Sequence, residues 1–305
     1  MKFPADRIDD CPVLKSGVPS FSVASRKPRP HPVPVDGFTW QYFALFLLGG
    51  AAGLVEAIAG GGGLLTVPAL LAAGLPPQLA LGTNKLQSSC GTALATFNYA
   101  RAGLIAWRDW IPGIAMTAAA SIAGALTATA ADPSHLRKLI PVALVLLAAY
   151  TAFKPDLGAG TRPARMKRLP FSLILGSALG FYDGFLGPGT GSFWMMACVL
   201  IQGLHLTAAT GVTKMMNLSS NLGSLGLFLL AGKVDFRIGL LMAAGQLIGA
   251  YAGSRIAIRQ GPRLIRPVFL TVVLALAAKL AWESFRPPEK PVRGALTDSP
   301  ATDAP

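Results

Sequence analysis

The sequence predicts an all-α, polytopic integral membrane protein built from two homologous repeats of about four to five helical segments each, with glycine-broken helices. The 305 residues are 52% hydrophobic and only 13% charged, whereas a soluble domain carries about 25% charged residues. Several apolar runs are long enough to cross a membrane. Glycine-rich breaks interrupt two of these runs, at 60–63 and 187–191.

The chain divides into a polar tail (1–37), a first apolar half (38–153), a basic linker (154–168), a second apolar half (169–285) and a second polar tail (286–305). We expect the proline-rich tails to be disordered and the linker to be cytoplasmic, because basic clusters between apolar spans mark cytoplasmic loops. The expected helical segments are 38–58, 64–73, 78–100, 110–131, 136–153, 171–186, 192–203, 206–230, 238–254 and 267–285.

The net charge of +13 lies mainly in the short loops and tails. A nucleic-acid-binding protein would gather it on one face of a soluble domain, so the expected surroundings are the lipid bilayer of the cell (inner) membrane and no nucleic acid. Three cysteines and three histidines are scattered along the chain without metal-ligand spacing. We therefore expect no metal, no cofactor and, without a catalytic set of side chains, no enzymatic activity.

The two halves share an ordered set of residues. Gly53, Glu56 and Gly60 recur at the same spacing as Gly180, Asp183 and Gly187, and the run containing Lys85 recurs around Lys214. Chance similarity between alanine-rich helices would explain the composition but not this order. Five segments per repeat would make the repeats inverted and four would make them parallel, and the sequence leaves both open.

The glycine breaks are predicted to expose backbone to a cavity, because an unwound segment in a membrane must be buried in protein or line a cavity. Short helices expected from Leu64 and Ser192 would then aim their N–H groups and positive dipole ends at an anion. The alternative is that the glycines only permit close packing. The substrate-binding residues expected here are Gly60, Gly61, Gly62, Gly63, Gly187, Gly189, Thr190 and Gly191.

Each half also places a lysine within an apolar span, where an ionisable group is by default functional. Alternatively, Lys85 and Lys214 lie near helix starts and extend to the interface. The substrate-binding residues expected on these two helices are Thr83, Asn84, Lys85, Ser89, Thr213, Lys214 and Asn217. Glu56 and Asp183 are expected to be coupling or gating residues. They would hold the lysines when substrate is absent, carry protons, or form a structural ion pair between the halves.

These motifs resemble the TauE/SafE family, the sulfite and organosulfonate exporter-type permeases. The resemblance rests on EAIAGGGGLLTVP and ALGTNKLQS in the first half and on GFLGPGTG and ATGVTK in the second. It implies a secondary transporter that moves sulfite, a sulfonate or a related small organic anion across the cytoplasmic membrane, by alternating access between the two repeats. The alternative function is a non-transporting membrane scaffold or assembly factor. The exact substrate, the direction, coupling to protons or another ion, and the oligomeric state stay open.

Overall fold

The computed structural model describes residues 38–136 and 163–261, together with the isolated positions 139, 142, 263, 264, 267 and 271. The chain divides into two units, Met1–Phe38 and Thr39–Pro305, and the fold below is that of the second. The tails expected at 1–37 and 286–305, the linker up to residue 162, and nearly all of the spans expected at 136–153 and 267–285 lie outside the described residues.

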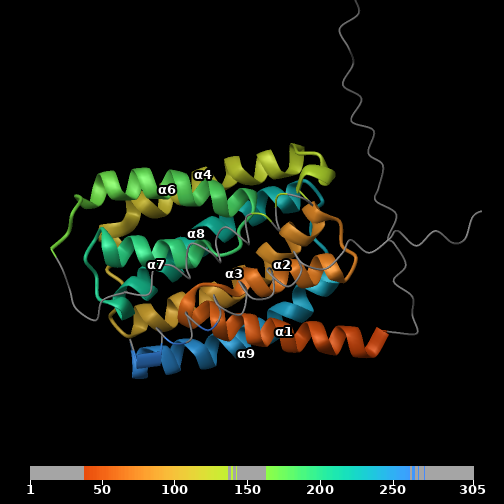
Figure 1. Cartoon of the computed structure of the whole chain (residues 1–305), viewed down its shortest axis with the longest axis horizontal. Helices are drawn as coiled ribbons and strands as arrows, with labels where there is room; N and C mark the ends of the chain where they lie inside the picture. Colours follow the sequence, from red (N-terminus) through yellow and green to blue (C-terminus); the bar gives the residue numbers. More distant parts are fainter. Residues whose placement is uncertain are drawn as a thin grey trace, which may run out of the picture. The chain divides into compact units, whose positions relative to one another are not determined.

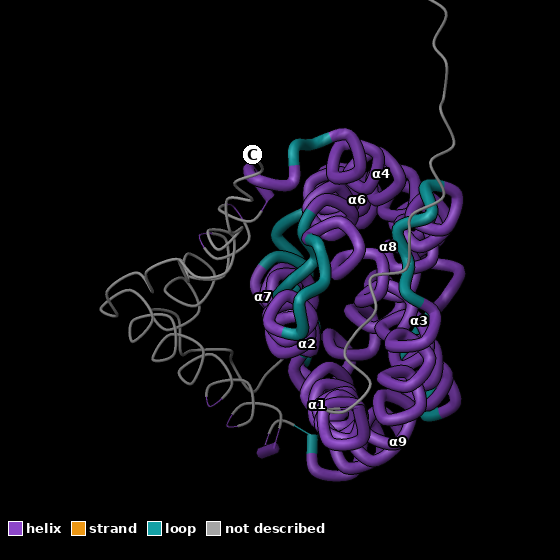
Figure 2. Tube along the Cα trace, turned by 90° about the vertical axis from the view of Figure 1, so that its right-hand side faces the viewer, coloured by secondary structure: helices purple, strands orange, loops and turns teal. Residues whose placement is uncertain are grey.

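The regular secondary structure in the described ranges is entirely helical (Figure 2), which confirms the predicted class. The helices are α1 (Phe38–Ala59), α2 (Gly62–Ala72), α3 (Pro77–Arg101), η3 (Trp107–Trp110), α4 (Ile111–Ala130), α6 (Arg168–Phe185), α7 (Thr190–Leu200), α8 (Leu206–Leu230) and α9 (Phe236–Gln260). The short helices α2 and α7 both have 11 residues, and the lysine helices α3 and α8 both have 25.

Local chemistry explains where several helices begin. Pro77 opens α3, a position where its missing N–H costs nothing. The side chain of Asp235 caps α9 by accepting from Ile238 N at 3.0 Å. The helices α2 and α7 begin two residues earlier than expected, because Gly60 and Gly187 turn the backbone with φ of 81° and 89°, a conformation that favours glycine.

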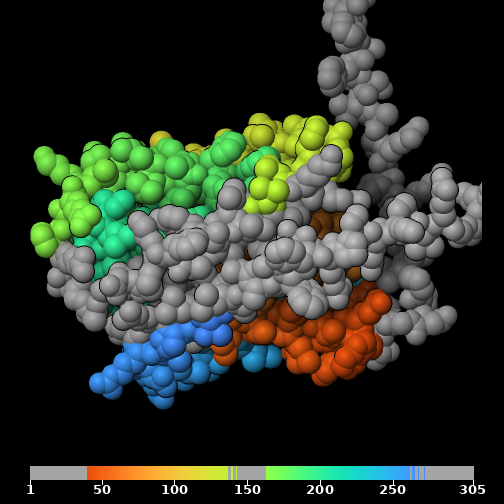
Figure 3. Space-filling view, viewed as in Figure 1, coloured from red at the N-terminus to blue at the C-terminus, as the bar shows by residue number. Residues whose placement is uncertain are grey.

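The helices form three groups in Figure 1. The pair α4 and α6 lies along one edge, the pair α1 and α9 along the opposite edge, and α2, α3, α7 and α8 lie between them. The space-filling view shows the same separation, with the surfaces of α6 and α1 at opposite edges of one face (Figure 3). The functional residues predicted on α3 and α8 are therefore carried by central helices.

Glycines bring each outer pair of helices into backbone contact. A Cβ added to Gly184 of α6 would lie 1.9 Å from Ser121 O of α4, and one added to Gly249 of α9 would lie 1.9 Å from Gly50 O of α1. No larger residue fits at either place without separating the helices. This small-residue packing is how helices associate in lipid, where burial of apolar surface drives little.

Corresponding helices of the two halves point in opposite directions. The helices α1, α3 and α9 run parallel to one another, and α4, α6 and α8 run the other way. Two successive contacts fix the direction of each pair of helices. Residue numbers rise together, as in parallel helices, for α1 and α9 (Gly50–Gly249, Leu54–Gly253), α3 and α9 (Thr83–Gly239, Asn98–Ser254), α4 and α6 (Thr117–Gly180, Ser121–Gly184) and α4 and α8 (Ile114–Ser219, Ala118–Gly223). They change in opposite senses, as in antiparallel helices, for α3 and α8 (Lys85–Asn221, Tyr99–Gly211). An inverted repeat requires this arrangement, so it favours five segments per repeat, although the repeat itself stays a prediction.

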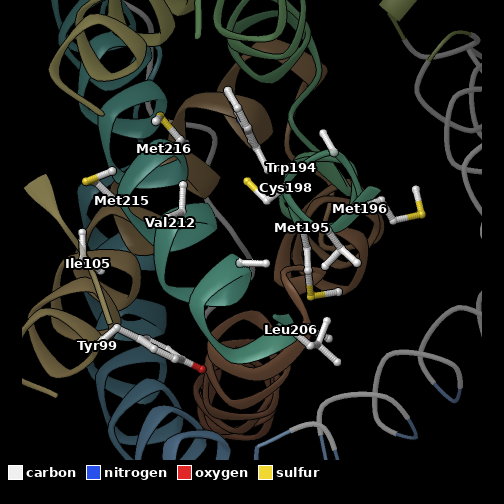
Figure 4. Packing of buried hydrophobic residues seen from close by; sticks show 14 of the residues in the cluster. Tyr99, Ile105, Trp194, Met195, Met196, Cys198, Leu206, Val212, Met215 and Met216 are labelled. Atoms are coloured by element: carbon white, nitrogen blue, oxygen red, sulfur yellow. The ribbon is translucent and has the colours of Figure 1, made fainter. Parts of the chain in front are cut away.

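The short helix α7 is anchored by a sulfur-rich apolar cluster against α8 (Figure 4). Trp194, Met195 and Cys198 of α7 are fully buried there, as is Met216 of α8. Flexible methionine side chains fill irregular space between helices well. The cluster fixes α7, and through it the glycine break that precedes this helix.

Two of the described helical stretches, Trp40–Ala59 and Trp107–Ala130, are long and apolar enough to cross a membrane by length and composition. Two such stretches do not by themselves show a membrane protein, because the core helix of a soluble protein passes the same test. The helix α3 falls short because it carries many polar residues, among them Asn84, Lys85 and Gln87, and these side chains are buried inside the bundle.

Candidate functional site

A polar cavity of about 20 Å³ lies where both glycine breaks meet the central helices α3 and α8. Residues from both halves of the chain line it: Glu56, Gly60, Gly63, Asn84, Lys85, Ser88, Asp183, Gly187, Gly189, Thr190, Gly191, Asn217 and Asn221. The structure therefore brings together most of the residues that the sequence singles out. A cavity of this size holds about one water molecule.

The first ion pair lies in the wall of the cavity. Lys85 Nζ of α3 is 2.9 Å from Asp183 Oδ1 of α6 and donates to Asn221 Oδ1 of α8 at 3.1 Å. Asp183 also accepts from the hydroxyl of Thr190 at 3.1 Å and from that of Ser220. The side chain of Lys85 is 2% exposed, so this cation reaches a site between the helices and not the membrane interface.

The second ion pair borders the cavity through its acid alone. Lys214 Nζ of α8 is 3.6 Å from Glu56 Oε1 of α1 and donates to the main-chain oxygen of the same residue. Glu56 accepts in addition from Gly62 N at 2.7 Å and from Asn217 Nδ2 at 2.9 Å. Lys214 is fully buried and is absent from the cavity wall. The carboxylate of Glu56 thus occupies the anion-attracting start of α2.

The two ion pairs cross between the halves. The lysine of the first half binds the acid of the second, and the lysine of the second half binds the acid of the first. All four side chains are nearly or completely buried, and their formal charges cancel. Buried charges are tolerated only when they are paired and hydrogen-bonded, so each half depends on the other for its charge balance.

The glycine breaks touch one another at the cavity. A Cβ added to Gly191 would lie 2.6 Å from Gly60 O and 2.7 Å from Asn217 Nδ2. One added to Gly60 would lie 2.7 Å from the main-chain carbon of Gly191. At Gly63 the nearest atom, Pro188 Cα, would be 3.4 Å away, an ordinary contact. Gly60 and Gly191 therefore serve close packing, as the alternative interpretation supposed, while both also line the cavity.

The amide of Asn84 connects the cavity to a polar network within the first half. Asn84 Oδ1 accepts from Thr66 Oγ1 at 2.5 Å and from Gln87 Nε2 at 2.9 Å. These partners, one on α2 and one on α3 itself, hold the side-chain amide by its oxygen, and Asn84 lines the cavity beside Lys85.

Six predicted binding residues lie outside the cavity wall: Gly61, Gly62, Thr83, Ser89, Thr213 and Lys214. Thr83 Oγ1 accepts from Asp235 N at the start of α9 at 2.9 Å. Ser89 and Thr213 donate to carbonyl oxygens of their own helices at 2.7 and 2.8 Å. In this structure, then, these side chains support the helices around the site.

Two cavity residues, Ser88 and Asn221, are not among the binding residues predicted above, although the sequence places Asn221 on the polar helix face of Lys214 and Asn217 and Ser88 among the polar neighbours of Lys85. Ser88 lies three positions after Lys85, and Asn221 lies one helical turn after Asn217. Side chains three or four positions apart share a helix face, so the helical period around the lysine and the asparagine is the signal that finds them.

The site has no spare room for an anion as it stands. One water fills a cavity of about 20 Å³, and sulfite or a small sulfonate has four or more heavy atoms. Lys85 is meanwhile occupied by Asp183. An anion can therefore bind only if the Lys85–Asp183 pair separates and the surrounding helices move apart.

Comparisons with known proteins agree with the membrane-transport features of the chain. The family described as "Sulfite exporter TauE/SafE" matches residues 45–280. The chain is 42% identical over 243 residues to "Probable membrane transporter protein ORF9" of Sinorhizobium sp, a match that covers 80% of the chain and 93% of that protein.

Two further relatives are similar over the same extent. The chain is 43% identical over 240 residues to "Probable membrane transporter protein YfcA" of Escherichia coli strain K12, covering 79% of the chain and 89% of the relative. It is 39% identical over 239 residues to a "Probable membrane transporter protein" of Haemophilus influenzae, covering 78% and 94%. No solved structure matches the chain.

Proposed function

The chain belongs to the TauE/SafE family and is a membrane transporter, and from that premise we propose that it moves a small sulfur-containing oxyanion, such as sulfite or a sulfonate, across the cytoplasmic membrane. The description of the family names sulfite export. We propose further that transport proceeds by alternating access, with the two halves of the chain moving against each other around the central cavity.

The observation that carries this proposal is the buried ammonium group of Lys85 in the wall of a polar cavity between the halves. A buried cation attracts an anion strongly, because little water screens it. Amides of Asn84, Asn217 and Asn221 surround the same space. Amide N–H groups and one ammonium group suit an oxyanion whose charge is spread over several oxygens.

The crossed ion pairs support alternating access. Each pair joins a helix of one half to a helix of the other, so the cavity opens to one side only if contacts between the halves change. The paired glycines Gly60 and Gly191 form a close backbone contact at the same place. A transporter needs such a contact that two bodies can break and remake.

The test is anion uptake into proteoliposomes that contain the purified protein. We expect uptake of radiolabelled sulfite, methanesulfonate or sulfoacetate above that of empty liposomes, and none of acetate above that background. The variant Lys85→Ala removes the cavity cation and should abolish the flux. The variant Lys167→Ala, at an exposed position before α6, is the matched control and should transport like the wild type.

Thermal unfolding of both variants in detergent separates a loss of transport from a loss of folding. Full anion flux in a folded Lys85→Ala protein would contradict the site. A wild-type protein that moves no anion of the panel but co-purifies with one membrane partner would instead support the scaffold function.

A further inference from the structure

We propose that the carboxylate of Asp183 occupies the place of the transported anion until it takes up a proton, so that anion and proton cross the membrane together. This inference rests on the proposed transport function. It assigns different roles to the two buried acids, which the sequence presents as equivalent: Asp183 carries the proton, and Glu56 stays charged.

The surroundings of Asp183 are those of a bound oxyanion. Its carboxylate forms an ion pair with the Lys85 ammonium group at 2.9 Å and accepts hydrogen bonds from the hydroxyl groups of Thr190, at 3.1 Å, and Ser220. A carboxylate oxygen and a sulfite or sulfonate oxygen accept the same hydrogen bonds. The donors that an anion needs are therefore present but occupied by a side chain of the protein.

The two hydroxyl groups allow Asp183 to become neutral without losing hydrogen bonds. Thr190 Oγ1 lies 2.8 Å from Gly187 O, and Ser220 Oγ lies 3.1 Å from Asn217 O. Each hydroxyl can donate one hydrogen bond, either to Asp183 or to that carbonyl oxygen. When the O–H group points to the carbonyl oxygen, the hydroxyl oxygen can accept a hydrogen bond from a protonated Asp183.

Glu56 cannot make this change without rearranging a neighbour. Its partners besides Lys214 are Gly62 N at 2.7 Å and Asn217 Nδ2 at 2.9 Å. The main-chain N–H of Gly62 cannot accept a hydrogen bond, and Asn217 could accept one only by turning its side-chain amide so that Oδ1 replaces Nδ2. A protonated Glu56 would leave buried donors facing an O–H group, which costs about 1–3 kcal/mol for each unsatisfied group. The start of α2 also favours the negative charge.

Among the described helices, the titratable group that forms an ion pair with Asp183 is Lys85, and the adjacent Tyr182 is the other titratable side chain that interacts electrostatically with this carboxylate. Thr190 of α7 and Ser220 of α8 do not titrate, and α4, which packs against α6, contains no acidic, basic, histidine, cysteine or tyrosine residue. The neighbouring Tyr182 donates its hydroxyl to Pro188 O at 2.8 Å. The remaining charges near the cavity, Glu56 and Lys214, bind each other.

The charges of the site then balance in both states. Without substrate, two lysines and two acids sum to zero. A proton from the aqueous phase adds to the carboxylate of Asp183, the O–H group turns to a hydroxyl oxygen, and Lys85 stays an ammonium group that binds a monovalent anion. The sum is again zero, whereas an anion without the proton would leave an unpaired charge buried at high cost.

The experiment uses full-length protein in liposomes that contain a trapped pH dye, with methanesulfonate as the probe. Methanesulfonate is a strong-acid anion at every working pH, so a pH dependence of its uptake comes from the protein, whereas sulfite itself takes up a proton near neutral pH. We expect wild-type uptake to rise with external acidity and to acidify the lumen by one proton per anion.

The variant Asp183→Asn should exchange labelled for unlabelled methanesulfonate but lose the acidification and the pH dependence. The variant Asp109→Asn, at an exposed pair outside the cavity, should behave like the wild type.

The outcomes test the role of Asp183, the coupling to protons and the transport function separately. If Asp183→Asn still moves protons together with methanesulfonate, Asp183 is not the proton carrier. If that variant does not fold, the wild-type ratio decides, because uptake without protons overturns the inference and a ratio of one supports it. A wild-type protein that moves neither methanesulfonate nor sulfite overturns the proposed function itself.

Discussion

The pairs Lys85–Asp183 and Lys214–Glu56 occupy corresponding places in the two halves, yet their surroundings differ. Lys85 faces the cavity, and its acid is held by two hydroxyl groups. Lys214 does not line the cavity, although its acid Glu56 does, and this acid accepts from Gly62 N at the start of α2 and from the amide of Asn217 on α8. We therefore propose different roles for these two pairs, one in exchange with substrate and the other in holding the helices together.

The largest effect on stability should come from replacing each of the two buried lysines separately by methionine. Lys214→Met leaves the charge of Glu56 buried beside donors that require it, so we expect a loss of about 3–5 kcal/mol in stability. Lys85→Met should cost less, about 1–3 kcal/mol, because Asp183 can take a proton and keep its hydroxyl partners. Thermal unfolding in detergent compares the two, and equal losses would remove the proposed division of roles.

A smaller effect should distinguish two glycines of the breaks. The Cβ of Gly191→Ala would lie 2.6 Å from Gly60 O, whereas that of Gly63→Ala would first meet Pro188 Cα at 3.4 Å. We expect the former to lose about 1–3 kcal/mol, the usual cost of overpacking, and the latter to unfold near the wild-type temperature. If both unfold alike, close contact between the breaks does not stabilise the fold.

The smallest effect belongs to an ion pair outside the cavity. Asp109 and Arg168 form a pair whose side chains are 45% and 47% exposed, and exposed pairs contribute about 0–1 kcal/mol. Asp109→Asn should therefore leave the unfolding temperature and the anion flux close to wild type. A loss as large as that of Lys85→Met would mean that burial does not decide which ion pairs matter in this chain.

Much of the fold could be predicted from the sequence. The apolar run at Leu206–Leu230 gave the bounds of α8, and the glycines at 60–63 and 187–191 located both breaks. The two starts of α2 and α7 were placed too late, because the left-handed turns at Gly60 and Gly187 let the helices begin sooner.

The arrangement of the candidate site could be predicted only in part. The sequence brought Glu56, Lys85, Asp183 and Lys214 forward as a group, and the structure places all four in two ion pairs. Which lysine meets which acid, and which lysine faces the cavity, depends on how α3 and α8 pack against α6 and α1. Helix periodicity gives the face of a side chain but not its partner across the bundle.

Equilibrium binding of radiolabelled methanesulfonate to the purified protein tests the central claim most directly. Binding to the wild type, to Lys85→Ala and to the exposed control Lys167→Ala would be measured at the same acidic pH. The loss of one charge-assisted contact, worth about 1.5–3 kcal/mol, predicts that Lys85→Ala binds roughly tenfold to a hundredfold more weakly while Lys167→Ala binds like the wild type. Equal binding by all three proteins would contradict the assignment of Lys85 and the cavity as the anion site.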